Sequence, residues 1–368
     1  MSKDMGVARS VSSRHGDSHA DVPGEQAGRE RRHVVVESKH LRSLRWIRLA
    51  YPEEILAVVL VVATAGVNIA IHHTLDANIL FATVNTYQAI FNIHIHEFGR
   101  ALRYFVMAYI AWEFLRFLAG RPVQVAEWSR SGKLAIVLRA LPTYFLCGAA
   151  FGNLSGFIHR LSPTDHDQWL IAADRIVGFG HDPIKLLEPL VTEARVRFFL
   201  QVYLSLYLVP WFAMMLFVSR GQLRAFRDQV VAWWLALTIG WSGYLLVPAI
   251  GPQYSLRDTY VRPVLDVERV LARGTEFLPR DAFPSLHTGF SVTVLIVVWR
   301  NTKNWFVRTA FTIWVVGIVF STMYLRIHYA IDVVAGIPLA FLATWLARRI
   351  NDWYAETALD RKPQARHD

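Results

Sequence analysis

Long apolar stretches with few charged residues recur along this chain, and they restrict what it can fold into. Only 18% of the 368 residues are charged, whereas about a quarter is usual for a soluble domain. Several stretches of about 18–20 residues are long enough to cross a bilayer as helices. The predicted spans are residues 54–72, 101–118, 134–152, 196–218, 230–248, 286–300, 307–323 and 331–348. The sequence therefore predicts an all-α, polytopic membrane helix bundle of about eight spans.

Basic residues between the spans predict the orientation of the bundle. They follow every second span, and cytoplasmic loops carry an excess of Lys and Arg. This places both chain ends in the cytoplasm and loops 73–100, 153–195, 249–285 and 324–330 on the outer side. The net charge of +10 is then explained by loop bias and lipid headgroup contact, and not by nucleic-acid binding.

The amino-terminal tail, residues 1–46, differs from the rest of the chain. Its first 28 residues are polar and lack apolar periodicity, which predicts disorder. Residues 29–48 are basic, as expected either for a juxtamembrane helix on anionic lipid or for an ordinary cytoplasmic flank. The first apolar run starts too late for a cleavable signal peptide. The single cysteine, Cys147, excludes an internal disulfide framework.

Two short histidine motifs stand at the outer edges of predicted spans. The first is FPSLH, residues 283–287, and the second is RIHYAID, residues 326–332. His328 and Asp332 are four residues apart, which is one helical turn. Two imidazoles and a carboxylate are suited to covalent phosphoryl transfer without a metal. One histidine attacks phosphorus, the other protonates the leaving oxygen, and the carboxylate orients the attacking ring.

Five arginines lie in the outer loop 249–285, against the expected charge bias. They are Arg257, Arg262, Arg269, Arg273 and Arg280. Beside the two histidines they are suited to an anion site, because guanidinium groups bind phosphate well. The alternative is that some of them contact lipid phosphates without specificity.

At these motifs the sequence resembles the type 2 phosphatidic acid phosphatase superfamily, whose members are polytopic lipid phosphatases and phosphotransferases. Its Pro-Ser-x-His signature is matched by residues 284–287. Its signature of Ser-Arg, five residues, His, three residues and Asp is matched by Ser321, His328 and Asp332. The resemblance implies a six-helix phosphatase-like core. It also implies that His328 is the nucleophile, Asp332 its partner and His287 the general acid. Ser285 and the neighbouring amides would hold phosphate oxygens.

Two cations expected from this superfamily are missing. Thr322 stands where the signature has arginine, and Arg326 is the nearest basic residue. Positions 322 and 326 share a helical face, so we expect Arg326 to deliver a guanidinium to the same phosphate. In the superfamily's Lys, six residues, Arg-Pro signature, Arg262 matches, but Ser255 replaces the lysine and Arg257 is the closest cation.

A narrower resemblance is to the branch that contains inositol phosphorylceramide synthases. It rests on the Pro-Ser-Leu-His motif, on the His-Tyr pair at 328–329, and on Pro248-Ala-Ile-Gly-Pro252 ahead of them. An upstream Asp…Gly-x-x-Pro segment is matched loosely by Asp174, Gly180 and Pro183. The resemblance covers residues 165–345.

These observations predict an integral-membrane phosphoesterase or phosphotransferase that acts on a lipid phosphate or lipid pyrophosphate through a phosphohistidine. The alternatives are a transferase of inositolphosphoryl or another headgroup to a lipid acceptor, and a non-catalytic lipid transporter or scaffold. No cofactor and no metal are expected. The predicted phosphate ligands are Ser285, Arg326, Arg262, Arg257 and Arg280.

We predict four regions and a bacterial inner membrane location with the active site facing outward. The regions are a disordered basic tail at 1–46, N-terminal spans at 47–160, a phosphatase-like core at 161–350 and a cytoplasmic tail at 351–368.

Overall fold

The computed structural model describes residues 50–72, 114–115, 118–120, 132–262, 264 and 280–359. The predicted disordered tail at 1–46, most of the predicted span 101–118, and Arg269 and Arg273 lie outside these ranges. All helices described below lie in one compact unit, Tyr51–Asp368.

Every regular element in the described ranges is helical. The long helices are α2 (Pro52–His72), α5 (Lys133–Leu161), α8 (Glu193–Leu204), α9 (Val209–Ser219), α10 (Leu223–Leu246), α13 (Leu286–Asn301), α14 (Trp305–Tyr324) and α15 (Ala330–Leu359). Each of the predicted spans apart from 101–118 falls on these helices. The short elements are α6 (Asp167–Val177), α7 (Pro183–Leu186), η2 (Glu188–Leu190), η3 (Ser205–Tyr207), α11 (Pro252–Ser255) and η4 (Arg257–Thr259).

Four helical segments are long and apolar enough to cross a membrane. They are Glu193–Ser219, Leu223–Leu246, Trp305–Tyr324 and Ala330–Ala355. Large apolar side chains such as Ile313 and Phe341 point away from the protein interior on these segments, as expected where lipid replaces water. The prediction of an all-α membrane helix bundle is confirmed for the described part of the chain. The count of eight spans stays a prediction.

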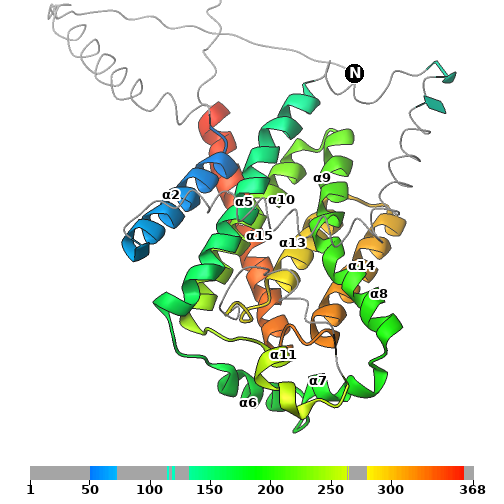
Figure 1. Cartoon of the computed structure of the whole chain (residues 1–368). Helices are drawn as coiled ribbons and strands as arrows, with labels where there is room; N and C mark the ends of the chain where they lie inside the picture. The colour runs from blue at the N-terminus through cyan, green and yellow to red at the C-terminus, as the bar shows by residue number, and fades with distance from the viewer. Residues whose placement is uncertain are drawn as a thin grey trace, which may run out of the picture. The chain divides into compact units, whose positions relative to one another are not determined.

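Helices α10, α13 and α15 pack against one another at the centre of the unit, and α14 packs on α13 beside them (Figure 1). The contact between α13 and α15 is very close at Gly336. A Cβ atom added there would lie 2.6 Å from the Ser285 carbonyl oxygen. Trp234, Leu286 and Leu339 belong to the largest buried apolar cluster beside this contact. The close approach brings the start of α13 against the first turns of α15.

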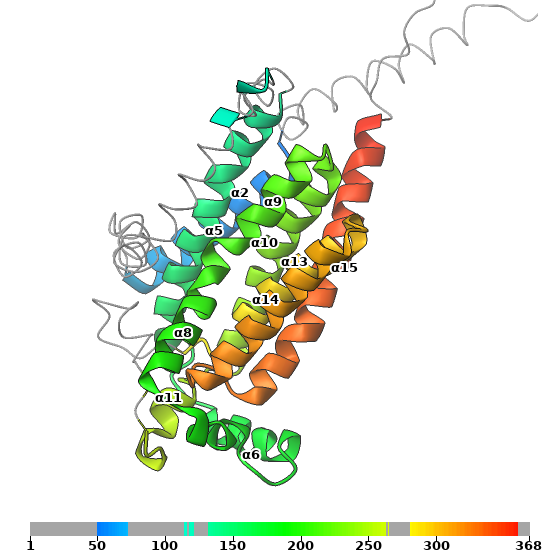
Figure 2. The ribbon, with the colours of Figure 1, turned by 90° about the vertical axis from the view of Figure 1, so that its right-hand side faces the viewer.

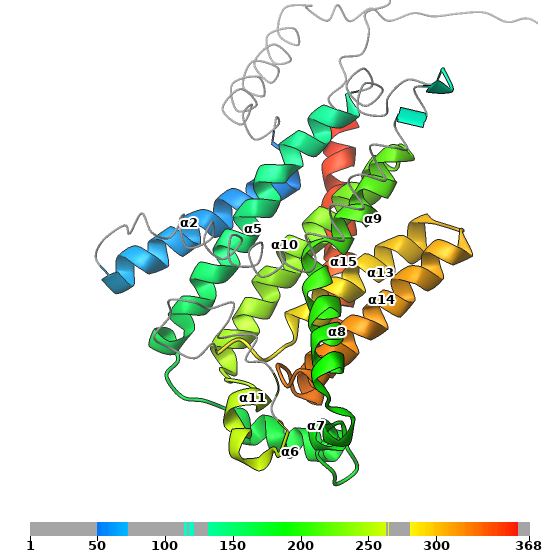
Figure 3. The same ribbon diagram turned by 45° about the vertical axis from the view of Figure 1, so that its right-hand side comes forward.

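The short helices α6, α7 and α11 gather at one end of the bundle, as all three views show (Figures 1, 2 and 3). Asp182 begins α7 and accepts hydrogen bonds from the Ile184 and Lys185 amides. At this end α15 begins, and both histidine motifs lie beside these short elements. This end corresponds to the predicted outer side of the bundle.

Candidate active site

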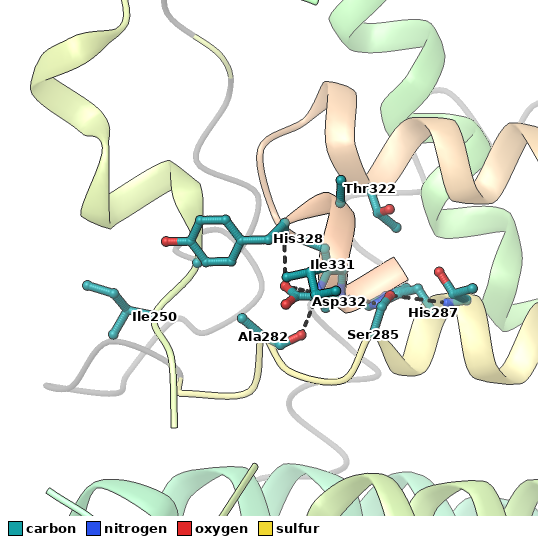
Figure 4. A network of polar contacts seen from close by, with 12 residues as sticks. Ile250, Ala282, Ser285, His287, Thr322, His328, Ile331 and Asp332 are labelled. Carbon is teal, nitrogen blue, oxygen red and sulfur yellow. Dashed lines mark hydrogen bonds and ion pairs between the residues drawn. The ribbon is translucent and has the colours of Figure 1, made fainter. Parts of the chain in front are cut away.

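The two histidine motifs meet in the structure. His287 Nδ1 lies 3.3 Å from His328 Nε2, although the residues are 41 positions apart. The motifs are also joined through their backbones, because the Ser285 amide donates to the Asp332 carbonyl at 3.0 Å. Figure 4 shows His287, His328, Asp332 and Ser285 in one network. The structure therefore brings together three predicted catalytic residues and one predicted phosphate ligand.

Local chain geometry places each histidine. Ser285 is the N-cap of α13, and its hydroxyl accepts from the Thr288 amide, so α13 begins beside His287. His328 follows a tight turn in which Arg326 has a positive φ of 60°. The amides of Ile327 and His328 both donate to the Thr322 carbonyl. The residue that replaces the expected arginine therefore anchors the turn that carries His328.

A backbone carbonyl determines the tautomer of His328. Its Nδ1 lies 2.8 Å from the Ala282 carbonyl oxygen, which can only accept, so Nδ1 carries the proton. His328 Nε2 then has its lone pair free to accept, and the proton between the two rings lies on His287 Nδ1. Nε2 of His328 is therefore the ring nitrogen whose lone pair faces His287.

Asp332 lies near His328 but does not make its closest contact. Asp332 Oδ2 is 3.6 Å from His328 Nδ1, which is too long for a hydrogen bond. The same oxygen accepts from the Tyr329 amide at 2.8 Å. The carboxylate is fully buried, and Oδ1 has no hydrogen-bond partner within the described residues. The short contact on His328 Nδ1 comes from the Ala282 carbonyl, whereas Asp332 accepts from the Tyr329 amide and so supports the local backbone.

The two histidines differ in exposure. His328 is 2% exposed, and burial lowers its pKa to about 4. His328 is therefore neutral at physiological pH, as a nucleophile must be. His287 keeps partial exposure, and the ring of Tyr203 from α8 stacks on it with centroids 4.2 Å apart.

Three of the predicted phosphate-binding arginines contact protein groups. The guanidinium of Arg326 lies 3.8 Å above the Tyr260 ring and 3.4 Å from Glu188. Arg262 donates to the carbonyls of Pro189 and Val191. Arg280 is paired with Asp165. Arg257 lies exposed on η4. Their role as phosphate ligands stays a prediction.

Glu188 is ionised as the partner of Arg326. Hydrogen bonds from the Arg262 and Val261 amides, with the nearby Arg326 charge, lower the pKa of the Glu188 carboxyl.

Two buried aspartates hold the outer elements against the site. Asp174 of α6 accepts from the amides of Ala330 and Ile331 at 3.0 and 2.7 Å. These are the first two residues of α15, directly after the His-Tyr pair. Asp167 accepts from the Gly251 amide and from the Tyr329 hydroxyl. Sequence reasoning noted Asp174 only as part of a loose motif and missed Asp167, because long-range capping leaves no local pattern.

In the part of the chain that the structure describes, no three His, Cys, Asp or Glu side chains are grouped to hold a metal ion.

The protein is thus a helical membrane protein in which the buried imidazole of His328 faces His287. Residues 168–346 match the family model described as the PAP2 superfamily, and this region contains both motifs. A curated relative, phosphoinositol dihydroceramide synthase of Bacteroides thetaiotaomicron, is 30% identical over 125 residues, covering 29% of this chain. The chain spans 40% of the length of this relative. No solved structure matches the chain.

The predicted resemblance is therefore confirmed, and its extent agrees with the expected residues 165–345. Residues 168–346 are similar to the PAP2 superfamily, a family of membrane phosphatases and phosphotransferases.

Proposed function

We propose that this protein is an integral-membrane phosphotransfer enzyme that acts on a lipid-linked phosphate through a phosphohistidine on His328. The observation that carries the proposal is the tautomer of His328. The Ala282 carbonyl accepts the Nδ1–H hydrogen bond of His328 at 2.8 Å, so the lone pair of Nε2 faces His287. The depressed pKa of His328 keeps that lone pair available.

The reaction has two balanced steps. His328 Nε2 attacks phosphorus, the bond from phosphorus to the leaving oxygen breaks, and His287 gives that oxygen its proton. In the second step water or an acceptor alcohol attacks the phosphohistidine. The bond from phosphorus to Nε2 breaks, and His287 takes the proton of the attacking oxygen. Water gives a phosphatase, and an alcohol gives a transferase.

Substrate must separate the two rings before the first step. The nitrogens are 3.3 Å apart, whereas attack needs phosphorus alone at about 3–3.5 Å from Nε2. A phosphoryl group therefore takes the place of His287 against His328 Nε2. Ser285 and the amides that begin α13 lie beside this position, where an N-terminal helix end attracts anions.

We also propose a membrane location and orientation for the site. We place the site on the extracytoplasmic face of a bacterial inner membrane, with both chain ends in the cytoplasm, because the basic loops predict that orientation. We propose that the enzyme works without a metal, with arginine charge stabilising the phosphoryl oxygens.

Transfer of a phosphorylated headgroup to a lipid acceptor is a second candidate function, and two observations favour it. The relative from Bacteroides thetaiotaomicron is named as a synthase. In addition, Arg280 and Arg326 are each paired with a carboxylate, which leaves less free positive charge for a doubly charged phosphomonoester. A phosphodiester donor has one negative charge and needs less neutralisation.

Replacement of His328 tests the proposal. Purified H328A is expected to lose lipid-phosphate turnover by at least about a thousandfold, because His328 supplies the nucleophile of the first step and the leaving nitrogen of the second. The parent is expected to trap an acid-labile, alkali-stable phosphoryl label that H328A does not trap. H181A serves as the matched control, since His181 is exposed at the turn after α6.

The outcomes separate the candidate functions. Activity of H328A equal to the parent would refute the nucleophile. Turnover that depends on an added lipid acceptor or polar alcohol indicates a transferase, and turnover with water alone indicates a phosphatase. A parent that is inert on phosphomonoesters and phosphodiesters, but moves lipid in vesicles, would support a transporter. Loss of turnover in a chelator would contradict the metal-free step.

A further inference from the structure

Tyr203 of α8 stacks on His287 from outside both histidine motifs. The ring centroids are 4.2 Å apart and the ring planes are inclined by 26°. Tyr203 is only 1% exposed, so its ring has little room to move. His328 approaches His287 at a centroid distance of 5.5 Å and an angle of 57°. The imidazole of His287 therefore contacts Tyr203 through its face and His328 through Nδ1.

The same apolar cluster holds Tyr203 and the turn before His328. Tyr203 and Leu204 of α8 pack with Tyr324, Leu325 and Ile327. Helix α8 also packs along α14, whose end leads into that turn. The position of Tyr203 relative to the catalytic histidines is thus set by buried packing and does not depend on a loop.

The two contacts of His287 respond differently to substrate. A phosphoryl group that enters between the histidines removes the Nδ1 contact with His328. Of the two ring contacts described for His287, the stack on Tyr203 remains. The negative face of an aromatic ring attracts a cation, and the ring that must donate a proton is the imidazolium form of His287.

We propose that Tyr203 is a positioning residue for His287, which fixes the plane of the imidazole and favours its protonated form once substrate has separated the pair. This inference rests on the proposed function, because it needs His287 to act as the general acid. Tyr203 touches no reacting atom and acts only through His287. Its effect must therefore depend on how much the leaving oxygen needs a proton.

The experiment compares two leaving groups. Bursts of leaving-group release are measured in detergent with dioctanoyl phosphatidate, whose alkoxide needs a proton, and with p-nitrophenyl phosphate, whose phenolate does not. Y203L removes the ring, and Y203F keeps it. Y244L is the matched control, because Tyr244 is equally buried at 1% exposure and lies in the separate, largest apolar cluster around α10.

We expect the rate of leaving-group release by Y203L to fall about 3- to 30-fold with phosphatidate, which corresponds to the interaction energy of a cation over an aromatic face. With p-nitrophenyl phosphate the rate should match that of the parent. Y203F should match the parent with both. The basic limb of the pH profile of kcat should move to lower pH in Y203L, because kcat reports the complex in which substrate has separated the histidines, and the imidazolium is less favoured there. Y244L should show no such dependence on the leaving group.

Other outcomes overturn the inference. An equal loss on both substrates, or no loss on either, would mean that Tyr203 is a packing residue. The H287A and H328A variants separate this failure from failure of the proposed function. If H328A is inactive and H287A shows the leaving-group dependence while Y203L does not, only the role of Tyr203 is wrong. If H328A stays active, the proposed function itself is wrong.

Discussion

Removal of the Asp174 carboxylate tests how the outer elements hold the segment that carries His328. Asp174 is 2% exposed and accepts from the Ala330 and Ile331 amides, so D174A leaves one buried and one partly buried donor without partners. Each costs about 1–3 kcal/mol, which gives about 2–6 kcal/mol in total. Burial raises the pKa of Asp174, so removing the carboxylate also relieves a desolvation cost. We therefore expect the free energy of unfolding of D174A to be lower than that of the parent by about 2–4 kcal/mol.

Two further variants, D174N and D182A, are compared with D174A. D174N keeps one acceptor oxygen, so its loss in the free energy of unfolding should be about half that of D174A. D182A also removes the acceptor of two amides, but at the start of the four-residue helix α7 and in a less buried place. It should lose only about 0.5–2 kcal/mol, as for an ordinary N-cap.

Unfolding in detergent, followed by tryptophan fluorescence, measures the loss of stability. Single-turnover assays measure the consequence for His328, which lies two residues before the capped amides. D174A should lose turnover even at temperatures where it remains folded. If D174A is no less stable than D182A and keeps full turnover, the two hydrogen bonds do not hold His328 in place, and the reasoning is refuted.

Two further predictions concern packing and pH. In G336A the new Cβ would lie 2.6 Å from the Ser285 carbonyl oxygen. We therefore expect overpacking to lower the free energy of unfolding by about 1–3 kcal/mol and to reduce turnover. The control G66A has open space around its Cβ and should be neutral in thermal unfolding and activity. Burial lowers the pKa of His328 from 6.5 to about 4, so the acid limb of kcat/KM should lie near pH 4. The unfolded chain takes up that proton first, so the contribution of His328 to stability should decline as pH falls from about 6.5 towards 4. An acid limb at the ordinary histidine pKa would contradict this burial.

The helices and the identity of the histidines were predictable because their signals are local. A span needs about 20 apolar residues in a row, and the described spans fall on helices. The one-turn spacing of His328 and Asp332 and the Pro-Ser-Leu-His motif are also contiguous patterns. Residues 168–346 indeed match the PAP2 superfamily. The role of Asp332 as the partner of His328 stays a prediction, and the structure adds the Ala282 carbonyl as the nearest acceptor, at 2.8 Å from Nδ1.

The sequence by itself determined that this chain forms a helical membrane bundle with two histidines and a carboxylate at one end, because hydrophobic length and residue spacing are properties of single segments. Tertiary structure alone decided that the histidine nitrogens meet at 3.3 Å, that Ala282 sets the tautomer, and that Tyr203 and Asp174 support the pair. These contacts join segments far apart in the chain, and a backbone carbonyl carries no side-chain signal. Their positions follow from the packing of the whole bundle, so no local sequence pattern predicts them.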